Sequence, residues 1–393
     1  MRVFILCPAN IATGGTELLH QFSKCLSDCG IENYMIYPTS DRIQCPTPQT
    51  FLKYGVKYVS QYVDASDSVL VLAETQIQFI DICKKGRVMI WWLSVDNYFY
   101  AYRKRIQEDN PDIFQLSTRK NLLHFVQSYY AKDFVNRYIN TESCYFLMDY
   151  ISDEIVLYAQ DNKDRYERKN VCLYNPKKGY EKLKPIIDAC REDIVWLPLI
   201  NMTPTEMADT MCQAKLYIDF GHHPGKDRIP REAAICGCCI LTNREGSAAY
   251  AEDVAMPEQY RIEDISDTSE VLAQIYNLVD HYEERIGEYA SYRAKILGEK
   301  DEFLQDLNNA VRMLKENAQT NVSQVVQENM EQYVGVLDSI SQAASKVCEL
   351  AENSKELCRE GDLSEAMNKL LTMDYVLQMI REAAYAELLD MSQ

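Results

Sequence analysis

The feature that most constrains the fold is an alternation of short apolar runs with amphipathic segments. Residues 3–8 form an apolar run, a glycine-containing loop follows, and apolar side chains then recur at helical spacing until Gly30. A further apolar run at 34–37 completes a strand–loop–helix–strand unit. This order is typical of the start of a Rossmann-like domain.

The alternation continues in two series. The first series predicts strands at 69–73, 88–93, 124–127 and 144–147, with helices at 76–85, 97–109 and 131–138. The second series predicts strands at 171–174, 194–197, 216–220 and 239–242, with helices at 180–190, 204–213 and 230–236. Alternating strands and helices imply parallel sheets covered on both faces.

A polar, charge-dense segment at 159–170 separates the two series, and an interdomain linker is expected there. We therefore predict an α/β protein of two Rossmann-like domains facing a cleft, at 1–160 and 168–300, with a C-terminal α-helical extension at 301–393. The extension carries 17 acidic and 7 basic residues, and its helices are expected to turn at 359–362. If the chain contacts a membrane surface or a second copy, this extension is where we expect that contact.

The net charge of the chain limits the classes of partner that it can bind. A net charge of −18 over 393 residues argues against a nucleic-acid binder, which needs a basic face. No run of 18 apolar residues occurs, so no transmembrane helix is expected. The opening residues lack the pattern of a secretory signal, which predicts a cytoplasmic protein with reduced cysteines.

Two loops at strand ends are candidates for binding an anion. Gly14 and Gly15 lie between the first strand and the first helix, where backbone amides and the helix dipole favour negative charge. Lys177 and Lys178 follow the first strand of the second series and can supply local positive charge in an acidic protein. The alternatives are a plain tight turn for the glycines and a solvated loop for the lysines.

A third loop, at 220–237, is basic where a helix begins. Lys226 and Arg228 lie at the positive end of the helix dipole, which suits a leaving phosphate. Glu232, in the first turn, is expected either to accept hydrogen bonds from ribose hydroxyls or to interact only with the dipole. His223 belongs to a His-His pair that forms a surface turn or a metal site, but no third ligand occurs at suitable spacing, so no metal is expected.

Asp96 lies just beyond the predicted strand at 88–93. A carboxylate there can orient or deprotonate an acceptor hydroxyl. Trp92 and Tyr98 beside it can stack on sugar rings. The alternative is an aspartate that caps a helix next to core aromatic residues.

The third loop resembles the nucleotide-sugar signature of retaining GT-B glycosyltransferases of the family-4 and family-1 type, which include capsule, O-antigen and exopolysaccharide transferases. The likeness rests on Glu232-Ala233, Cys236-Gly237, the strand at 240–242 and Gly246, and Gly225 falls where the family has its glycine. Lys178, the Gly14-Gly15 loop and the segment at 126–134 are also similar to the family pattern. The family's first motif glutamate is replaced by Pro224, so its role would pass to a neighbour such as His223 or Asp219.

The resemblance implies a metal-independent, retaining glycosyltransferase that needs no cofactor beyond its substrate, a nucleoside diphosphate sugar. The acceptor would be a glycan or a lipid-linked sugar. The resemblance and the loops together assign the catalytic residues as Asp96, Glu232 and His223. They assign the nucleotide-sugar-binding residues as Gly14, Gly15, Lys177, Lys178, Gly225, Lys226, Arg228, Glu232 and Gly246. The alternatives are a nucleotide-sugar epimerase on the same fold and a non-catalytic partner that docks through its helical extension.

Overall fold

A computed structural model describes residues 1–38, 45–106, 111–360, 362–373 and 377, with the backbone alone described at 316–340, 343 and 344. The chain divides into two units, Met1–Asn317 and Ala318–Gln393. Each unit is considered by itself.

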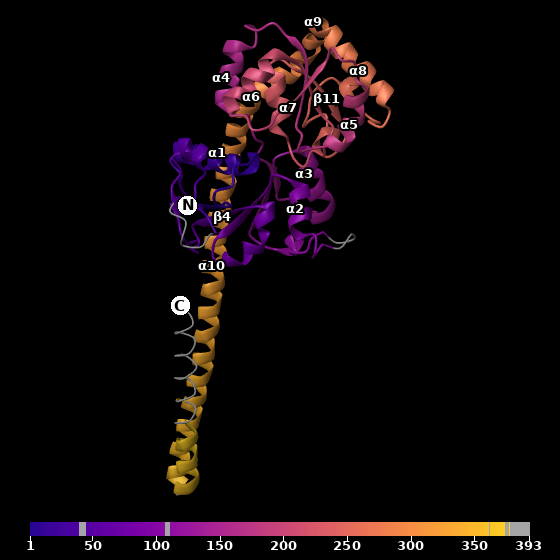
Figure 1. The fold of residues 1–393 in the computed structure, drawn as a ribbon. Helices are drawn as coiled ribbons and strands as arrows, with labels where there is room; N and C mark the ends of the chain where they lie inside the picture. Colours follow the sequence, from indigo (N-terminus) through magenta and orange to yellow (C-terminus); the bar gives the residue numbers. More distant parts are fainter. Residues whose placement is uncertain (39–44, 107–110, 361, 374–376, 378–393) are drawn as a thin grey trace. The chain divides into compact units, whose positions relative to one another are not determined.

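The first unit contains two parallel sheets (Figure 1). The first sheet has the strand order β3-β2-β1-β4-β5-β6-β7. Its strands are β1 (Arg2–Leu6), β2 (Glu32–Ile36), β3 (Tyr58–Val59), β4 (Ser68–Ala73), β5 (Arg87–Trp92), β6 (Leu122–Val126) and β7 (Cys144–Phe146). Both faces are covered, because Val3 and Ile5 of β1 pack in one apolar cluster and Phe4 and Leu6 pack in another. The strand order reverses between β1 and β4, and a crevice for ligands opens at such a point.

The helical segments around this sheet are α1 (Gly14–Asp28), α2 (Val95–Tyr102), α3 (Tyr129–Phe134), the 3₁₀ helices η1 (Gln49–Tyr54), η2 (Glu74–Ile82) and η3 (Leu116–Thr118), and the π-helical η4 (Val135–Ile139). The helix predicted at 76–85 is present as the 3₁₀ helix η2, which begins two residues earlier and ends three residues earlier. Of its four buried residues, Glu74, Ile77 and Ile80 are spaced three apart, as in a 3₁₀ repeat, and Gln76 is the fourth. The predicted helix at 97–109 is shorter than expected, and residues 107–110 lie outside the described part.

The second sheet has the order β12-β11-β10-β8-β9. Its strands are β8 (Lys169–Tyr174), β9 (Val195–Pro198), β10 (Ala214–Asp219), β11 (Cys239–Asn243) and β12 (Arg261–Ile262). The helical segments that accompany it are α4 (Asp153–Asn162), α5 (Tyr180–Ala189), α6 (Pro204–Gln213), α7 (Arg228–Ile235), η5 (Ser247–Ala249), η6 (Glu258–Tyr260), α8 (Thr268–Asp280), α9 (Tyr282–Arg285) and η7 (Ile286–Tyr289). The order reverses between β8 and β10, so a second crevice opens at their carboxyl ends.

Regular structure occupies both ends of the predicted linker at 159–170, and residues 163–168 connect them. Helix α4 runs through Asn162 and strand β8 begins at Lys169. Ile155 and Ala159, one helical turn apart, are buried in the core of the second sheet. Most of the charged side chains of the segment follow the helix, and among them Arg168 donates to the carbonyls of Met211, Ala214 and Cys236.

Helix α10 (Ala290–Glu360) begins before the predicted extension. Phe303, Leu307, Ala310 and Leu314 recur at alternating spacings of four and three, and all are buried in a cluster of the first sheet. The first part of the extension is therefore an integral part of the first unit.

The second unit contains the rest of α10 and a helix at 363–373. The predicted capping of the next helix by Asp362 is confirmed, because its carboxylate accepts from the Glu365 amide at 3.1 Å, whereas residue 361 of the predicted turn lies outside the described residues. Among the described helices, none combines the length and the apolar character needed to span a bilayer.

Candidate functional site

A cavity of about 520 Å³ lies at the carboxyl ends of the strands, between the two sheets of the first unit. The first sheet contributes the residues that follow its central strands, and the second sheet contributes the loop after β10 and the start of α7. The lining residues are Pro8, Ile11, Thr13, Gly14, Gly15, Thr16, Leu19, Ala73, Glu74, Thr75, Leu93, Ser94, Asn97, Gln127, Asp149, Pro224, Gly225, Lys226, Asp227, Arg228, Ile229 and Glu232.

The N-terminus of α1 forms one wall of this cavity. Thr13 caps the helix, since its hydroxyl accepts from the Thr16 amide and its carbonyl accepts from the Glu17 amide at 2.9 Å. The first amides of a helix have no partner within the helix, so those of Gly14 and Gly15 remain to bind a ligand. The positive end of the α1 dipole thus faces the cavity at the glycine loop that is predicted to bind an anion.

The basic side chains of the loop after β10 already have carboxylate partners. Arg228 pairs with Glu17 of α1, and Lys226 contacts Glu299 of α10 at 2.7 Å. Burial makes an unpaired cation costly, which explains why each has a partner. The predicted basic loop is therefore neutralised in this structure, and an incoming phosphate has to replace a carboxylate at Arg228.

Lys226 belongs to a larger buried network. Arg231 of α7 contacts Glu299 and Asp149 at 2.6 Å each, and all three side chains are almost fully buried. Asp149 follows β7 of the first sheet, so the network ties both sheets to α10. These contacts give Lys226 a structural role in addition to its place at the cavity wall.

Glu232 faces the cavity without a neutralising contact. Its side chain is 7% exposed, and no described residue donates a hydrogen bond to it. Burial raises the pKa of Glu232, while the charges of Arg228 and Arg231 oppose that shift. A buried acceptor that lacks a partner among the described residues is suited to the hydroxyl groups of a ligand.

Gly225 and Gly246 allow close backbone approaches. A Cβ atom at Gly225 would lie 2.3 Å from the Leu93 carbonyl oxygen at the end of β5. A Cβ atom at Gly246 would lie 2.0 Å from the His223 carbonyl oxygen, and Gly246 has a φ of 61°. Gly246 is outside the cavity lining, and Gly225 brings the loop after β10 against the first sheet.

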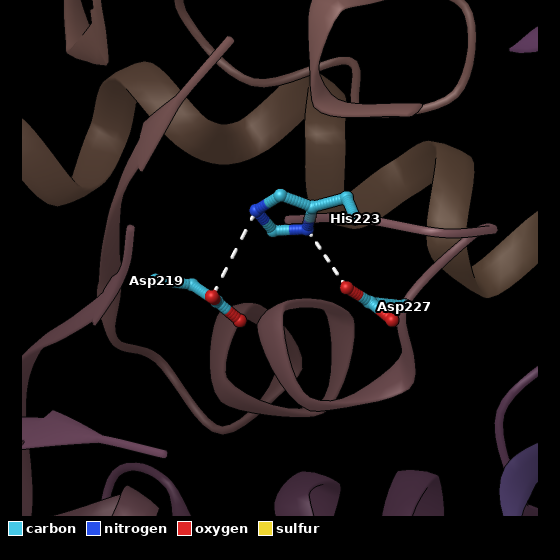
Figure 2. A group of neighbouring side chains, drawn as sticks. All are labelled: Asp219, His223 and Asp227. Carbon is cyan, nitrogen blue, oxygen red and sulfur yellow. Dashed lines mark ion pairs between the residues drawn. The ribbon is translucent and has the colours of Figure 1, made fainter. Parts of the chain in front are cut away.

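His223 lies between two aspartates at the end of β10, as Figure 2 shows. Its Nδ1 is 2.8 Å from Asp227 and its Nε2 is 3.8 Å from Asp219. The ligand atoms of the three residues lie within 4.8 Å of one another, a grouping that could hold a metal ion. The expectation that no third ligand occurs near His223 is thus wrong, because the turn after the strand brings together residues spaced four apart.

A cation of the protein already occupies this cluster. The Lys178 ammonium contacts Asp227 and lies 3.9 Å from Asp219. Lys178 and the cluster lie where the order of the second sheet reverses. Of these residues Asp227 lines the 520 Å³ cavity, whereas Lys178, Asp219 and His223 are outside its lining. Lys177 is exposed, and its backbone amide donates to the Asn175 side chain.

Asp96 is held away from the cavity lining. Its carboxylate accepts from the Tyr130 hydroxyl at 3.0 Å and contacts His222 Nε2 at 2.8 Å. Trp92 and Tyr98 are fully buried, so the expected stacking on sugar rings is wrong for both. The Trp92 indole instead donates to His124 at 3.0 Å, since a buried indole N–H needs an acceptor.

Sequence reasoning missed Glu74, the first residue after β4. It lines the cavity, and its Oε2 accepts from the Leu93 amide at 2.9 Å. Burial raises its pKa to about 7, although backbone hydrogen bonds lower it. The sequence did contain a signal for it, because a charged residue directly after the apolar run at 69–73 lies at the ligand-binding edge of the sheet.

No family model and no curated protein matches the chain. Solved structures do resemble it. A glycosyltransferase from Rickettsia africae is 9% identical and covers 80% of this chain and 98% of its own, with a TM-score of 0.52. Sucrose-phosphate synthase from Thermosynechococcus elongatus is 13% identical, covering 80% and 99%, with a TM-score of 0.55.

HepE from Anabaena, solved in complex with UDP-glucose, is 11% identical and covers 81% of this chain and 100% of its own, with a TM-score of 0.54. At these identities the similarity establishes the fold. The chain has the GT-B architecture of two Rossmann-like domains facing a cleft, as the sequence predicts.

Proposed function

We propose that the chain is a glycosyltransferase that moves a sugar from a nucleoside diphosphate sugar to an acceptor hydroxyl. The observation that carries the proposal is the cavity between the two sheets, where Glu232 without a hydrogen-bond partner lies near the free amides at the start of α1. The sequence signature around Glu232 and the UDP-glucose in the complex of HepE favour the same donor class.

In this proposal Glu232 accepts hydrogen bonds from the donor ribose, and the diphosphate binds the amides of Gly14 and Gly15. Arg228 lies beside them, with its Cδ 3.2 Å from the Cβ position of Gly14. The diphosphate would replace Glu17 as the partner of Arg228. Because Arg228 and the helix dipole supply positive charge, we propose that transfer requires no metal ion.

The transfer step forms a bond between the acceptor oxygen and the anomeric carbon while the bond from that carbon to the phosphate oxygen breaks. The proton of the acceptor hydroxyl ends on the departing diphosphate, which leaves as the nucleoside diphosphate. We propose retention of anomeric configuration from the likeness of the loop at 220–237 to the retaining family. Pro224 offers no carboxylate at the cavity wall, and His223 lies outside the lining.

For the acceptor we propose a glycan or a lipid-linked sugar, and for the pathway the synthesis of a surface polysaccharide or glycoconjugate. The resemblance of the sequence to polysaccharide transferases supports this pathway. We keep the helical extension as the proposed contact with a membrane surface or a second copy.

Release of nucleoside diphosphate from a panel of nucleotide sugars tests the proposal. We compare the wild type with the double variant Glu17→Gln/Arg228→Gln, because removing both partners leaves neither charge buried and unpaired. Charge-assisted hydrogen bonds contribute about 1.5–3 kcal/mol, so donor affinity should fall about 10- to 150-fold. Glu17→Gln alone, which retains Arg228, is the control and should bind donor at least as well as the wild type.

Two results would contradict the proposal. An altered donor sugar in the absence of any acceptor would indicate an epimerase. Failure of every nucleoside diphosphate to shift the melting temperature would indicate a non-catalytic partner protein.

A further inference from the structure

The first sheet's side of the cavity carries no cation. Among the described lining residues from this sheet, the charged side chains are Glu74 and Asp149. Asp149 is paired with Arg231 at 2.6 Å. Glu74 forms no ion pair within the described part of the chain, so its negative charge is not neutralised by a neighbour.

Glu74 is held in a fixed position. It is the first residue after β4, next to β1, at the point where the strand order reverses. Its side chain is 3% exposed, and the Leu93 amide of the neighbouring strand end donates to its Oε2 at 2.9 Å. A carboxyl group fixed in this way loses little further entropy when it accepts a hydrogen bond from a ligand.

Apart from Glu74 and the paired Asp149, the side chains that the first sheet contributes to the lining are neutral. Ser94, Asn97 and Gln127 can exchange hydrogen bonds with hydroxyl groups, and Ile11 and Leu93 offer apolar surface to the faces of a sugar ring. A phosphate or carboxylate placed here would meet the charge of Glu74 at low dielectric with no cation of this wall to offset it. A hydroxyl group, by contrast, can donate to the carboxylate.

We infer that Glu74 binds the reacting hydroxyl of the acceptor, and that the reacting end of the acceptor is an uncharged, hydroxyl-bearing sugar. This inference rests on the proposed function, because it assigns the acceptor side of the same cavity. It also moves the acceptor-binding role from Asp96, which pairs with His222 and Tyr130 outside the lining, to Glu74.

Binding of small sugars by the full chain, saturated with UDP at a pH well above 7 so that Glu74 is ionised, tests the inference. The neutral probes are the methyl glycosides of glucose, galactose and mannose, and the anionic probes are glucose 6-phosphate and glucuronate, all measured by saturation-transfer NMR. We expect at least one neutral probe to bind about tenfold more tightly than either anionic probe. Glu74→Gln should weaken that neutral probe about 10-fold or more and reduce the discrimination against the anionic probes.

The variants are chosen so that a loss of binding is not caused by a loss of folding. The amide oxygen of Glu74→Gln can still accept from the Leu93 amide, and Glu74→Asp retains the charge while drawing it back from the cavity. Glu74→Asp should therefore weaken the neutral probe yet still exclude the anionic ones. Glu181→Gln, on the exposed surface of α5, is the matched control and should change neither.

Unchanged binding of the neutral probe by Glu74→Gln, or binding of anionic and neutral probes with equal affinity by the wild type, would overturn the inference. The same samples report separately on the proposed function, because UDP binding is measured first by calorimetry. If UDP binds but the sugar probes behave otherwise than expected, the acceptor assignment is contradicted and the donor assignment is not. If UDP does not bind, the proposed function itself is contradicted.

Discussion

At the scale of single residues, the carboxylates of the site fall into two groups. Glu17 and Glu299 each contact a basic side chain, whereas Glu232 and Glu74 line the cavity without one. Charged residues near a strand end could be recognised in the sequence, but their pairing could not. It depends on contacts such as that of Arg228 with Glu17, which joins residues 211 positions apart.

The ionisation of Glu74 predicts a dependence of stability on pH. Its pKa is raised from 4.5 to about 7 by burial in the folded chain, so the folded state holds this proton more tightly than the unfolded state. The stabilisation from this group is complete below about pH 4.5 and is lost as the pH rises to about 7. Over that range the free energy of unfolding of the wild type, relative to Glu74→Gln, should fall by about 3 kcal/mol.

Urea denaturation at several pH values measures this difference. The exposed variant Glu181→Gln should follow the wild type at every pH. A constant difference between the wild type and Glu74→Gln from pH 4.5 to 7 would show that the carboxyl group is not buried as described.

Gly225 makes a steric prediction at the same scale. Gly225→Ala places a Cβ atom against the Leu93 carbonyl, so the free energy of unfolding should fall by about 1–3 kcal/mol. Gly298→Ala in α10 meets open space and should raise it by about 0.5–1 kcal/mol. Urea denaturation of the two variants gives the comparison, and equal effects would exclude the close approach at Gly225.

At the scale of elements, local sequence signals predicted some helix boundaries correctly. Helix α6 begins and ends at the predicted residues because Thr203 caps it with Glu206 in a capping box and Pro204 starts it. The last turn of helix α4 was predicted as part of the linker at 159–170, since that segment is rich in charged residues. The burial of Ile155 and Ala159 depends on the second sheet, which no local pattern reports.

Glu299 of helix α10 contacts Lys226 and Arg231 beside the second sheet, and Arg231 in turn contacts Asp149 of the first. Replacing Glu299 with glutamine leaves Lys226 and Arg231 buried with less negative charge beside them, so the free energy of unfolding should fall by about 3–5 kcal/mol. The exposed neighbour Glu302→Gln should have little effect. Thermal and urea unfolding of both variants test this prediction. Equal stability of the two variants would show that Glu299 does not pair with Lys226 and Arg231 in solution.

At the scale of the whole molecule, the first unit ends at Asn317, well inside the predicted helical extension. The sequence indicated that a helical segment follows the sheets, but its composition did not reveal that Phe303 and Leu314 complete the first core. A chain that ends at Asn317 should therefore fold and bind nucleoside diphosphate, whereas one that ends at residue 300 should not fold. Circular dichroism and calorimetry on both truncations test this, and loss of folding in the longer one would contradict the division into units.

The central claim is that the cavity between the two sheets binds a nucleoside diphosphate sugar. Isothermal titration of UDP and UDP-sugars into the full chain, with Glu232→Gln as the comparison, tests it most directly. We predict saturable binding by the wild type and an affinity about 10- to 150-fold lower for the variant, because a charged acceptor of hydroxyl hydrogen bonds is removed. Equal affinities, or no binding by the wild type to any nucleoside diphosphate in an extended panel, would contradict the account.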